Sequence, residues 1–221
     1  MQPYYDHAGI QIFHGDCRDI LPTLDPVDLV LTDPPYGIGL DTDNSRFSGG
    51  NNVTQAKRRA YGRIEGAGLP VKNDHAPFDP SFLLDYGKHQ IIWGWNNYPD
   101  RLPRGACLVW LKRYDEAFGT FLSDAELAWM SKGHGVYCRR DLSNNGVSRE
   151  RVHPTQKPLS LMRWCLTFFP DAQSILDPFM GSGTTLLATK QLGRSCIGIE
   201  LDERYCEIAA MRLQQEVMAF G

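Results

Sequence analysis

One short stretch combines groups that could hold a planar substrate. An apolar run at residues 27–32 ends at Asp33, Pro34, Pro35 and Tyr36. Each proline restricts φ to about −65°, and a residue before a proline is kept extended, so this turn is rigid. Its carboxylate and main-chain carbonyls can accept hydrogen bonds, and its aromatic ring offers a face for stacking. A strand that merely ends in a stiff turn would have the same sequence, so this stretch alone does not distinguish a structural turn from a binding site.

A second stretch carries the elements of a nucleoside-binding site. Residues 174–203 follow the pattern of a strand, a glycine-rich turn, a helix, a second strand and an acid. Gly181 and Gly183 would let the backbone turn tightly and approach a ligand at the amino end of the helix. Glu200 follows about 20 positions later, the spacing at which dinucleotide folds place a carboxylate on ribose hydroxyls. This full context favours a nucleoside ligand over a simple packing turn.

The composition of the same loop narrows the class of ligand. A P-loop requires a lysine directly after its last glycine, and the dinucleotide fingerprint requires a third small residue where this chain has Leu186. Asp177 and Phe179 supply an acid and an aromatic ring, which suit a cationic or amino group better than a pyrophosphate. S-adenosylmethionine, with an adenosine, an ammonium and no phosphate, therefore fits better than NAD or ATP.

Three motifs together resemble those of the amino-methylating DNA methyltransferases, the adenine-N6 and cytosine-N4 enzymes. Residues 33–36 resemble the catalytic motif of that family and residues 177–185 its cofactor loop, while HPTQKPLSLM at 153–162 resembles a third motif. The catalytic motif comes first and the cofactor loop last, which is the order of the permuted β group. The resemblance covers nearly the whole chain.

The resemblance implies a fold and a place for the site. The fold is the α/β, Rossmann-like fold of S-adenosylmethionine-dependent methyltransferases, with a seven-stranded, mostly parallel sheet, one antiparallel strand, and helices on both faces. The strand at 10–13 would lie beside that at 196–199, and the strand at 27–32 beside that at 174–176. The catalytic turn and the cofactor loop would then leave the carboxyl ends of neighbouring strands, where open α/β sheets bind ligands. We expect a single methyltransferase domain over residues 1–221.

The resemblance also implies an activity and its residues. The activity is site-specific transfer of a methyl group from S-adenosylmethionine to the N6 amine of adenine in double-stranded DNA. It would proceed by base flipping and direct in-line transfer, leaving S-adenosylhomocysteine. The implied catalytic residues are Asp33, Pro34, Pro35 and Tyr36. The implied cofactor-binding residues are Asp16, Cys17, Asp33, Thr155, Gln156, Lys157, Asp177, Pro178, Phe179, Gly181, Ser182, Gly183, Thr184, Thr185, Glu200 and Leu201, with Lys157 a candidate for the carboxylate of the cofactor.

Short apolar runs predict the strands that carry these motifs. Their near-continuous apolarity is typical of strands covered on both faces of a parallel sheet. We predict helices over residues 160–169 and 184–193, and a last helix with Asp202 as its N-cap. The predicted strands are residues 10–13, 27–32, 90–95, 107–111, 126–130, 174–176 and 196–199.

Basic residues gather in two segments although the net charge of the chain is −3. Residues 39–76 and 132–152 are loop-like, and we interpret them as candidate DNA-recognition regions that clamp a polyanion. Recognition by loops alone leaves open a short target site, weak specificity or a homodimer. The candidate DNA-binding residues are Arg46, Lys57, Arg58, Arg59, Arg63, Arg139, Arg140, Arg149 and Arg151.

Cysteine usage and hydropathy indicate the compartment. The six cysteines form no C-x-x-C pair and several lie in apolar runs, so we predict reduced, mostly buried thiols and no metal site. No apolar run approaches the roughly 18 residues of a membrane span, and the amino terminus lacks the basic-then-apolar order of a signal peptide. We expect a cytoplasmic protein without membrane association, in a bacterium or, if phage-encoded, in its host.

Other functions stay open at this stage. A cytosine-N4 enzyme shares the geometry, but such enzymes usually carry serine at the position of Asp33, which favours adenine. Related RNA or protein-glutamine methyltransferases tend to carry asparagine there and to have the cofactor motif first. A nucleotide-binding oxidoreductase or a non-methylating nucleotide-binding protein belongs to another class, and binding of S-adenosylmethionine rather than NAD would exclude it.

Overall fold

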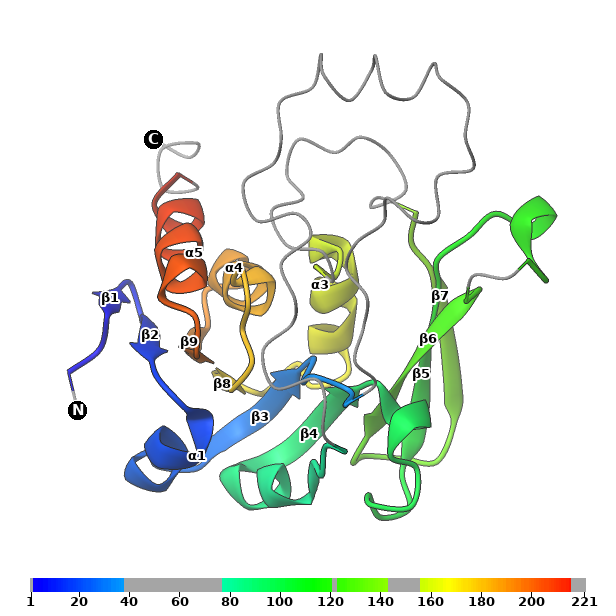
Figure 1. Ribbon diagram of the computed structural model, residues 1–221, viewed down its shortest axis with the longest axis horizontal. Helices are drawn as coiled ribbons and strands as arrows, with labels where there is room; N and C mark the ends of the chain where they lie inside the picture. The colour runs from blue at the N-terminus through cyan, green and yellow to red at the C-terminus, as the bar shows by residue number, and fades with distance from the viewer. Residues whose placement is uncertain (1, 38–76, 121–122, 143–155, 216–221) are drawn as a thin grey trace.

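The computed structural model describes residues 2–37, 77–120, 123–142 and 156–215 (Figure 1). These residues form a nine-stranded sheet in the order β1-β2-β9-β8-β3-β4-β6-β5-β7. The strands are β1 (Tyr5–His7), β2 (Ile10–His14), β3 (Val27–Thr32), β4 (Gly87–Trp93), β5 (Ala106–Leu111), β6 (Ala125–Met130), β7 (Val136–Arg140), β8 (Ser174–Asp177) and β9 (Ser195–Glu200).

Five neighbouring strands form the parallel centre of the sheet. β2 pairs with β9, β9 with β8, β8 with β3, and β3 with β4, all in parallel. The two neighbour relations expected from the sequence, β2 beside β9 and β3 beside β8, are therefore confirmed. β6 is antiparallel to both β4 and β5, and the short β1 is antiparallel to β2. The mixed α/β fold agrees with the expected Rossmann-like methyltransferase architecture.

The expected number of seven strands, with one antiparallel, was wrong. β1 is three residues long and returns through a tight turn in which Ala8 and Gly9 have positive φ. β7 pairs with β5 although its side chains are mostly exposed, with Val136 at 68%. An edge strand without a buried apolar run gives little periodic signal. Residues 132–152, predicted to be loop-like, thus contain a strand at 136–140, whereas residues 39–76 lie outside the described part of the chain.

The boundary of β4 also differs from the prediction. The apolar run predicted a strand to residue 95, but β4 ends at Trp93. Gly94 has a φ of 85°, which is left-handed, and it turns the chain into a short 3-10 helix, η4 (Trp95–Asn97). The remaining predicted strands match the observed ones to within one residue at each end.

Helices cover both faces of the sheet (Figure 1). α3 (Leu159–Thr167), α4 (Thr184–Gln191) and α5 (Glu203–Gln215) pack on one face, and α1 (Cys17–Ile20) with the 3-10 helices η1 (Leu21–Thr23) and η3 (Ser81–Tyr86) packs on the other. A further 3-10 helix, η5 (Asp115–Ala117), follows β5. The predicted helices are confirmed, and the Asp202 carboxylate accepts from the Arg204 main-chain N–H at 3.2 Å, as expected of an N-cap.

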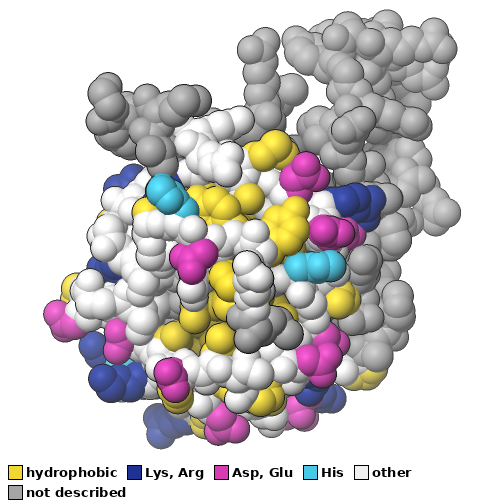
Figure 2. Space-filling view, turned by 90° about the vertical axis from the view of Figure 1, so that its left-hand side faces the viewer, with side chains coloured by type: hydrophobic (Ala, Val, Ile, Leu, Met, Phe, Trp, Pro, Cys, Tyr) yellow, Lys and Arg dark blue, Asp and Glu magenta, His cyan; other side chains and the backbone are white. Residues whose placement is uncertain are grey.

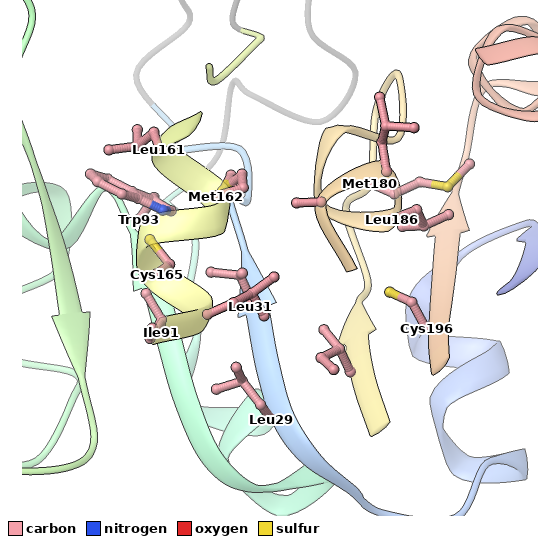
Figure 3. Close-up of a cluster of buried hydrophobic side chains, with 14 of the residues drawn as sticks. Leu29, Leu31, Ile91, Trp93, Leu161, Met162, Cys165, Met180, Leu186 and Cys196 are labelled. Carbon is pink, nitrogen blue, oxygen red and sulfur yellow. The ribbon is translucent and has the colours of Figure 1, made fainter. Parts of the chain in front are cut away.

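The central strands are apolar on both sides because each side has its own core. Leu29 and Leu31 of β3 contribute to the core under α3 and α4, whereas Val30 belongs to the core on the α1 side. Figure 3 shows Leu31 and Ile91 below the α3 side chain of Cys165. Burial on both faces explains why β3 has near-continuous apolarity rather than alternation. This packing fixes the carboxyl end of β3, from which the turn at residues 33–36 leaves.

The cysteines are free thiols, as predicted. Four are buried, whereas Cys107 is partly buried and Cys138 is exposed on β7. In the described part of the chain, no helix has both the length and the apolarity that crossing a membrane requires.

Candidate active site

The predicted catalytic turn and the predicted cofactor loop meet at the carboxyl ends of β3 and β8. The Thr32 hydroxyl at the end of β3 donates a hydrogen bond of 2.7 Å to the Asp177 carboxylate at the end of β8. Both side chains are buried. Because Asp33 directly follows Thr32, this bond holds the predicted catalytic turn beside the first residue of the glycine loop.

The turn after β3 positions its own acid. The Tyr36 hydroxyl donates to Asp33 Oδ1 at 2.6 Å, and the Asp33 side chain is 18% exposed. The ring of Tyr36 lies against Gly94, where a Cβ atom would come within 2.1 Å of the ring. Gly94 is therefore a site residue that the sequence analysis missed. The glycine between two tryptophans in residues 93–95 was the available signal.

Lys157 bridges two carboxylates in this site. Its Nζ lies 2.5 Å from Asp33 Oδ2, 2.9 Å from Glu126 Oε2 and 3.2 Å from the Tyr36 hydroxyl. The other oxygen of Glu126 pairs with Lys112 at 2.8 Å. The predicted cofactor residue Lys157 thus contacts Asp33, the predicted catalytic acid. Glu126 and Lys112 were not predicted, and their only sequence signal was a charge within or next to an apolar strand.

Burial and charge act in opposite directions on this cluster. Burial raises the pKa of Asp33. Burial also lowers the pKa of Lys157, but the carboxylates of Asp33 and Glu126 outweigh it, so the net change is upward. For Glu126, burial raises the pKa, but Lys157 and Lys112 outweigh it and bring it to about 2. Lys157 and Glu126 are therefore both charged at neutral pH.

The glycine loop is tied to the end of β9. Gly181 and Gly183 have φ values of 50° and 78°, and Gly183 caps the amino end of α4. The Gly181 N–H donates to Glu200 Oε2 at 3.0 Å, and the Asp202 N–H donates to Glu200 Oε1 at 2.8 Å. Burial raises the pKa of Glu200. The acid predicted to bind ribose hydroxyls therefore lies directly beside the loop.

Further predicted cofactor residues surround the same strand ends. The Gly15 N–H donates to the Glu200 main-chain oxygen at 2.9 Å, which brings Asp16 next to β9. Asp16 caps α1, and the side chain of Cys17 is buried. The Ser182 hydroxyl donates to Gln156 at 3.3 Å, so the segment before α3 reaches the loop. Leu201 is exposed, and Thr155 lies outside the described residues.

The ionised carboxylate of Asp177 should lower the stability of the fold at pH values above about 6. Burial raises its pKa to about 6, although hydrogen bonds from Thr185, Thr32 and the Phe179 N–H oppose this. A carboxyl whose folded pKa is raised destabilises the fold once pH exceeds the unfolded value. Asp177→Asn should therefore raise the free energy of unfolding at pH 8 by up to about 3 kcal/mol.

The measurement is urea denaturation from pH 4 to pH 8. The gain from Asp177→Asn should shrink as pH falls below 6, because the wild-type carboxyl then becomes neutral in the folded state. Asp171→Asn, a matched change at an exposed position, should give no such pH dependence. A constant difference across the range would contradict the assignment of the raised pKa to Asp177.

Two of the predicted DNA-binding residues, Arg139 and Arg140, lie on β7. Arg140 forms an ion pair with Asp115, and Arg139 Nε lies 3.9 Å from Asp141. β7 is at the sheet edge opposite β1 (Figure 1). Outside the described residues lie Arg46, Lys57, Arg58, Arg59, Arg63, Arg149 and Arg151.

On the face of the molecule beside β1, acidic and basic side chains are interspersed around exposed hydrophobic ones (Figure 2).

Comparison with known proteins identifies the family. Residues 129–211 match the family model described as DNA methylase, N6_N4_Mtase. The type II methyltransferase M2.DpnII of Streptococcus pneumoniae is 49% identical over 258 aligned residues, which cover 97% of this chain and 93% of that protein.

Solved structures show the same fold. The M1.HpyAVI–SAM complex has a TM-score of 0.51 and 22% identity, covering 92% of this chain and 99% of the other. The cytosine-N4-specific PvuII DNA methyltransferase has a TM-score of 0.56 and 16% identity, and the match covers 96% of this chain and 88% of the PvuII chain. With the family model and the 49% identical relative, these findings show that the chain belongs to the amino-methylating DNA methyltransferases, the family that modifies N6 of adenine or N4 of cytosine.

Proposed function

We propose that this chain transfers a methyl group from S-adenosylmethionine to the N6 amine of adenine in double-stranded DNA. The observation that supports this most is the position of the Asp33 carboxylate. It is hydrogen-bonded to Tyr36 and lies next to Thr32, which contacts Asp177 of the glycine loop. A hydrogen-bond acceptor for an amine is thereby adjacent to a loop suited to a nucleoside.

The side chains around the loop fit S-adenosylmethionine. Asp177 and Glu200 offer carboxylates for an ammonium and for ribose hydroxyls, and both would repel a pyrophosphate. The left-handed glycines let main-chain atoms approach a ligand closely. The Phe179 ring adds an apolar wall. It makes an edge-to-face contact with the Phe78 ring, with the ring centroids 5.4 Å apart. When bound, the cofactor supplies an electrophilic methyl group on a positively charged sulfur.

The residues of the catalytic turn prepare the amine. The exocyclic nitrogen of adenine is a poor nucleophile because its lone pair is delocalised into the ring. Hydrogen bonds from its N–H groups to the Asp33 carboxylate and the Pro34 carbonyl favour a pyramidal nitrogen with a localised lone pair. The prolines fix these acceptors in advance, so positioning contributes much of the acceleration. Tyr36 offers a face on which a base flipped out of the duplex can stack.

Cytosine-N4 methylation is the second candidate. The fold similarity to the cytosine-N4-specific PvuII enzyme supports it, since both amines would need the same acceptors. Asp33 favours adenine, because cytosine-N4 enzymes of the family usually carry serine at that position. Relatives of this chain are named as type II methyltransferases. We therefore propose DNA modification beside a restriction enzyme in the bacterial cytoplasm, with residues 39–76 and 132–152 contacting the DNA.

Identification of the methylated nucleoside tests this function. The protein is incubated with duplex DNA and S-adenosylmethionine, and the digested nucleosides are separated by mass spectrometry. N6-methyladenine is the expected product, and N4-methylcytosine would overturn the adenine assignment. As a control for the cofactor, S-adenosylmethionine or its demethylated product should raise the melting temperature, whereas NAD should not. A shift with NAD alone would contradict the proposed reaction.

A further inference from the structure

Glu126 is an acid of the site that has no role in the reaction described so far. It lies on the antiparallel strand β6, and both of its carboxylate oxygens are paired. Oε2 lies 2.9 Å from Lys157 and Oε1 lies 2.8 Å from Lys112. Because Lys157 also contacts Asp33, one ammonium is shared between the catalytic carboxylate and a second one.

Sharing of this ammonium matters because Lys157 competes with the substrate. Asp33 Oδ1 accepts from Tyr36, and Oδ2 accepts from Lys157. Each carboxylate oxygen has two lone pairs, so an amine that donates to Asp33 must share an oxygen with Tyr36 or Lys157 or displace one of them. Lys157 is only 4% exposed, so its charge has no access to bulk water if it leaves Asp33. Releasing a buried ammonium from a carboxylate without another charged acceptor is strongly unfavourable.

Glu126 removes this difficulty, because it is already in contact with the ammonium. We propose that Glu126 is a positioning residue that keeps Lys157 paired while the target amine takes its place on Asp33 Oδ2. This rests on the proposed methyl transfer. In the absence of a base, Lys157 pairs with both acids, and in its presence the pair with Glu126 dominates. Lys112 compensates the charge of Glu126 in both states, so the cluster of two acids and two lysines stays neutral.

The charge of Asp33 depends on groups from several elements. Burial has the largest effect and raises its pKa, Lys157 lowers it, and Glu126 raises it. The titratable groups around it are Tyr36 from its own turn, Lys157 from the segment before α3, Glu126 from β6, Tyr98 from the segment after η4, and Asp177 from β8. Removal of the Glu126 charge and removal of the Lys157 charge should therefore move the titration of Asp33 in opposite directions.

The test measures methyl transfer against pH for the wild type, Glu126→Gln and Lys157→Gln. Glu126→Gln should lower kcat about tenfold or more, because Lys157 then has no second carboxylate partner among the residues that the structure describes, and it stays on Asp33. KM for S-adenosylmethionine should change little. The acidic limb of the kcat profile should move to lower pH in Glu126→Gln and to higher pH in Lys157→Gln. Glu207→Gln, a matched change at an exposed position of α5, should leave the profile unchanged.

Two results would overturn the inference. One is wild-type kcat in Glu126→Gln, and the other is a loss of kcat with no movement of the acidic limb, which is the outcome for a purely structural role. The melting curve shows whether Glu126→Gln folds. If it does not fold, two other results test the inference: the acidic limb of the kcat profile should move to higher pH in Lys157→Gln, and Glu126→Asp should keep most of the wild-type kcat. The opposite results would overturn the inference. Wild-type protein that yields no methylated nucleoside refutes the proposed function instead, so the two failures are distinguishable.

Discussion

Asp33→Ala should lower the rate of methyl transfer about 10²–10³-fold while leaving the binding of S-adenosylmethionine nearly intact. Asp33 supplies the charged acceptor that orients the target amine, and alanine has no acceptor to replace it. Loss of one preorganised polar group of this kind costs about 10²–10³-fold in kcat. Asp33 is held by Tyr36 and Lys157, whereas the Gly181 N–H of the glycine loop donates to Glu200. The loop should therefore keep its conformation.

The measurement combines single-turnover transfer of labelled methyl to DNA with calorimetric titration of the cofactor. Asp33→Asn separates charge from shape, because its amide oxygen can still accept from Tyr36, and it should also lose most activity. Asp85→Ala, at an exposed position of η3, serves as the control with wild-type rates. Normal transfer by Asp33→Ala would show that another group accepts the amine, and the mechanism proposed above would be wrong.

Gly94→Ala should reduce both stability and activity. Gly94 has a φ of 85°, a conformation that costs an alanine about 1–3 kcal/mol. Its new Cβ would also lie 2.1 Å from the Tyr36 ring, so the ring must move. Movement of Tyr36 removes its hydrogen bond to Asp33 and displaces the proposed stacking face. We expect a fall in kcat of about 10²-fold, as for a misplaced catalytic group.

Gly193→Ala isolates the backbone contribution of this change. Gly193 also has a left-handed φ of 68°, but no atom lies within 4 Å of a Cβ built there. In urea denaturation it should lose only the stability that the left-handed backbone costs an alanine, which is less than the loss in Gly94→Ala, and it should keep its kcat. Equal kcat values for Gly94→Ala and the wild type, measured well below the melting temperature, would contradict the role assigned to the contact between Gly94 and Tyr36.

Local sequence was sufficient for the motifs and for the elements that carry them. The rigid turn at residues 33–36, the left-handed glycines before α4 and the acid at the end of β9 are properties of short segments, since φ preferences and turn chemistry act within a few residues. Near-continuous apolar runs located the central strands because each is covered on both faces. The resemblance to the methyltransferase family also implied which of these strands are neighbours, and the pairing of β3 with β8 agrees.

Tertiary structure alone determined what the side chains of the site contact. β1 and β7 escaped prediction because main-chain pairing, rather than a buried apolar run, holds an edge strand. Lys157 reaches Asp33 and Glu126 from a distant part of the chain, and no periodicity encodes such a contact. The close approach of Tyr36 to Gly94 depends in the same way on the packing of β3 beside β4. Local sequence preferences thus determined the rigid turn and the glycine loop, whereas long-range packing determined which charged side chains surround the Asp33 carboxylate.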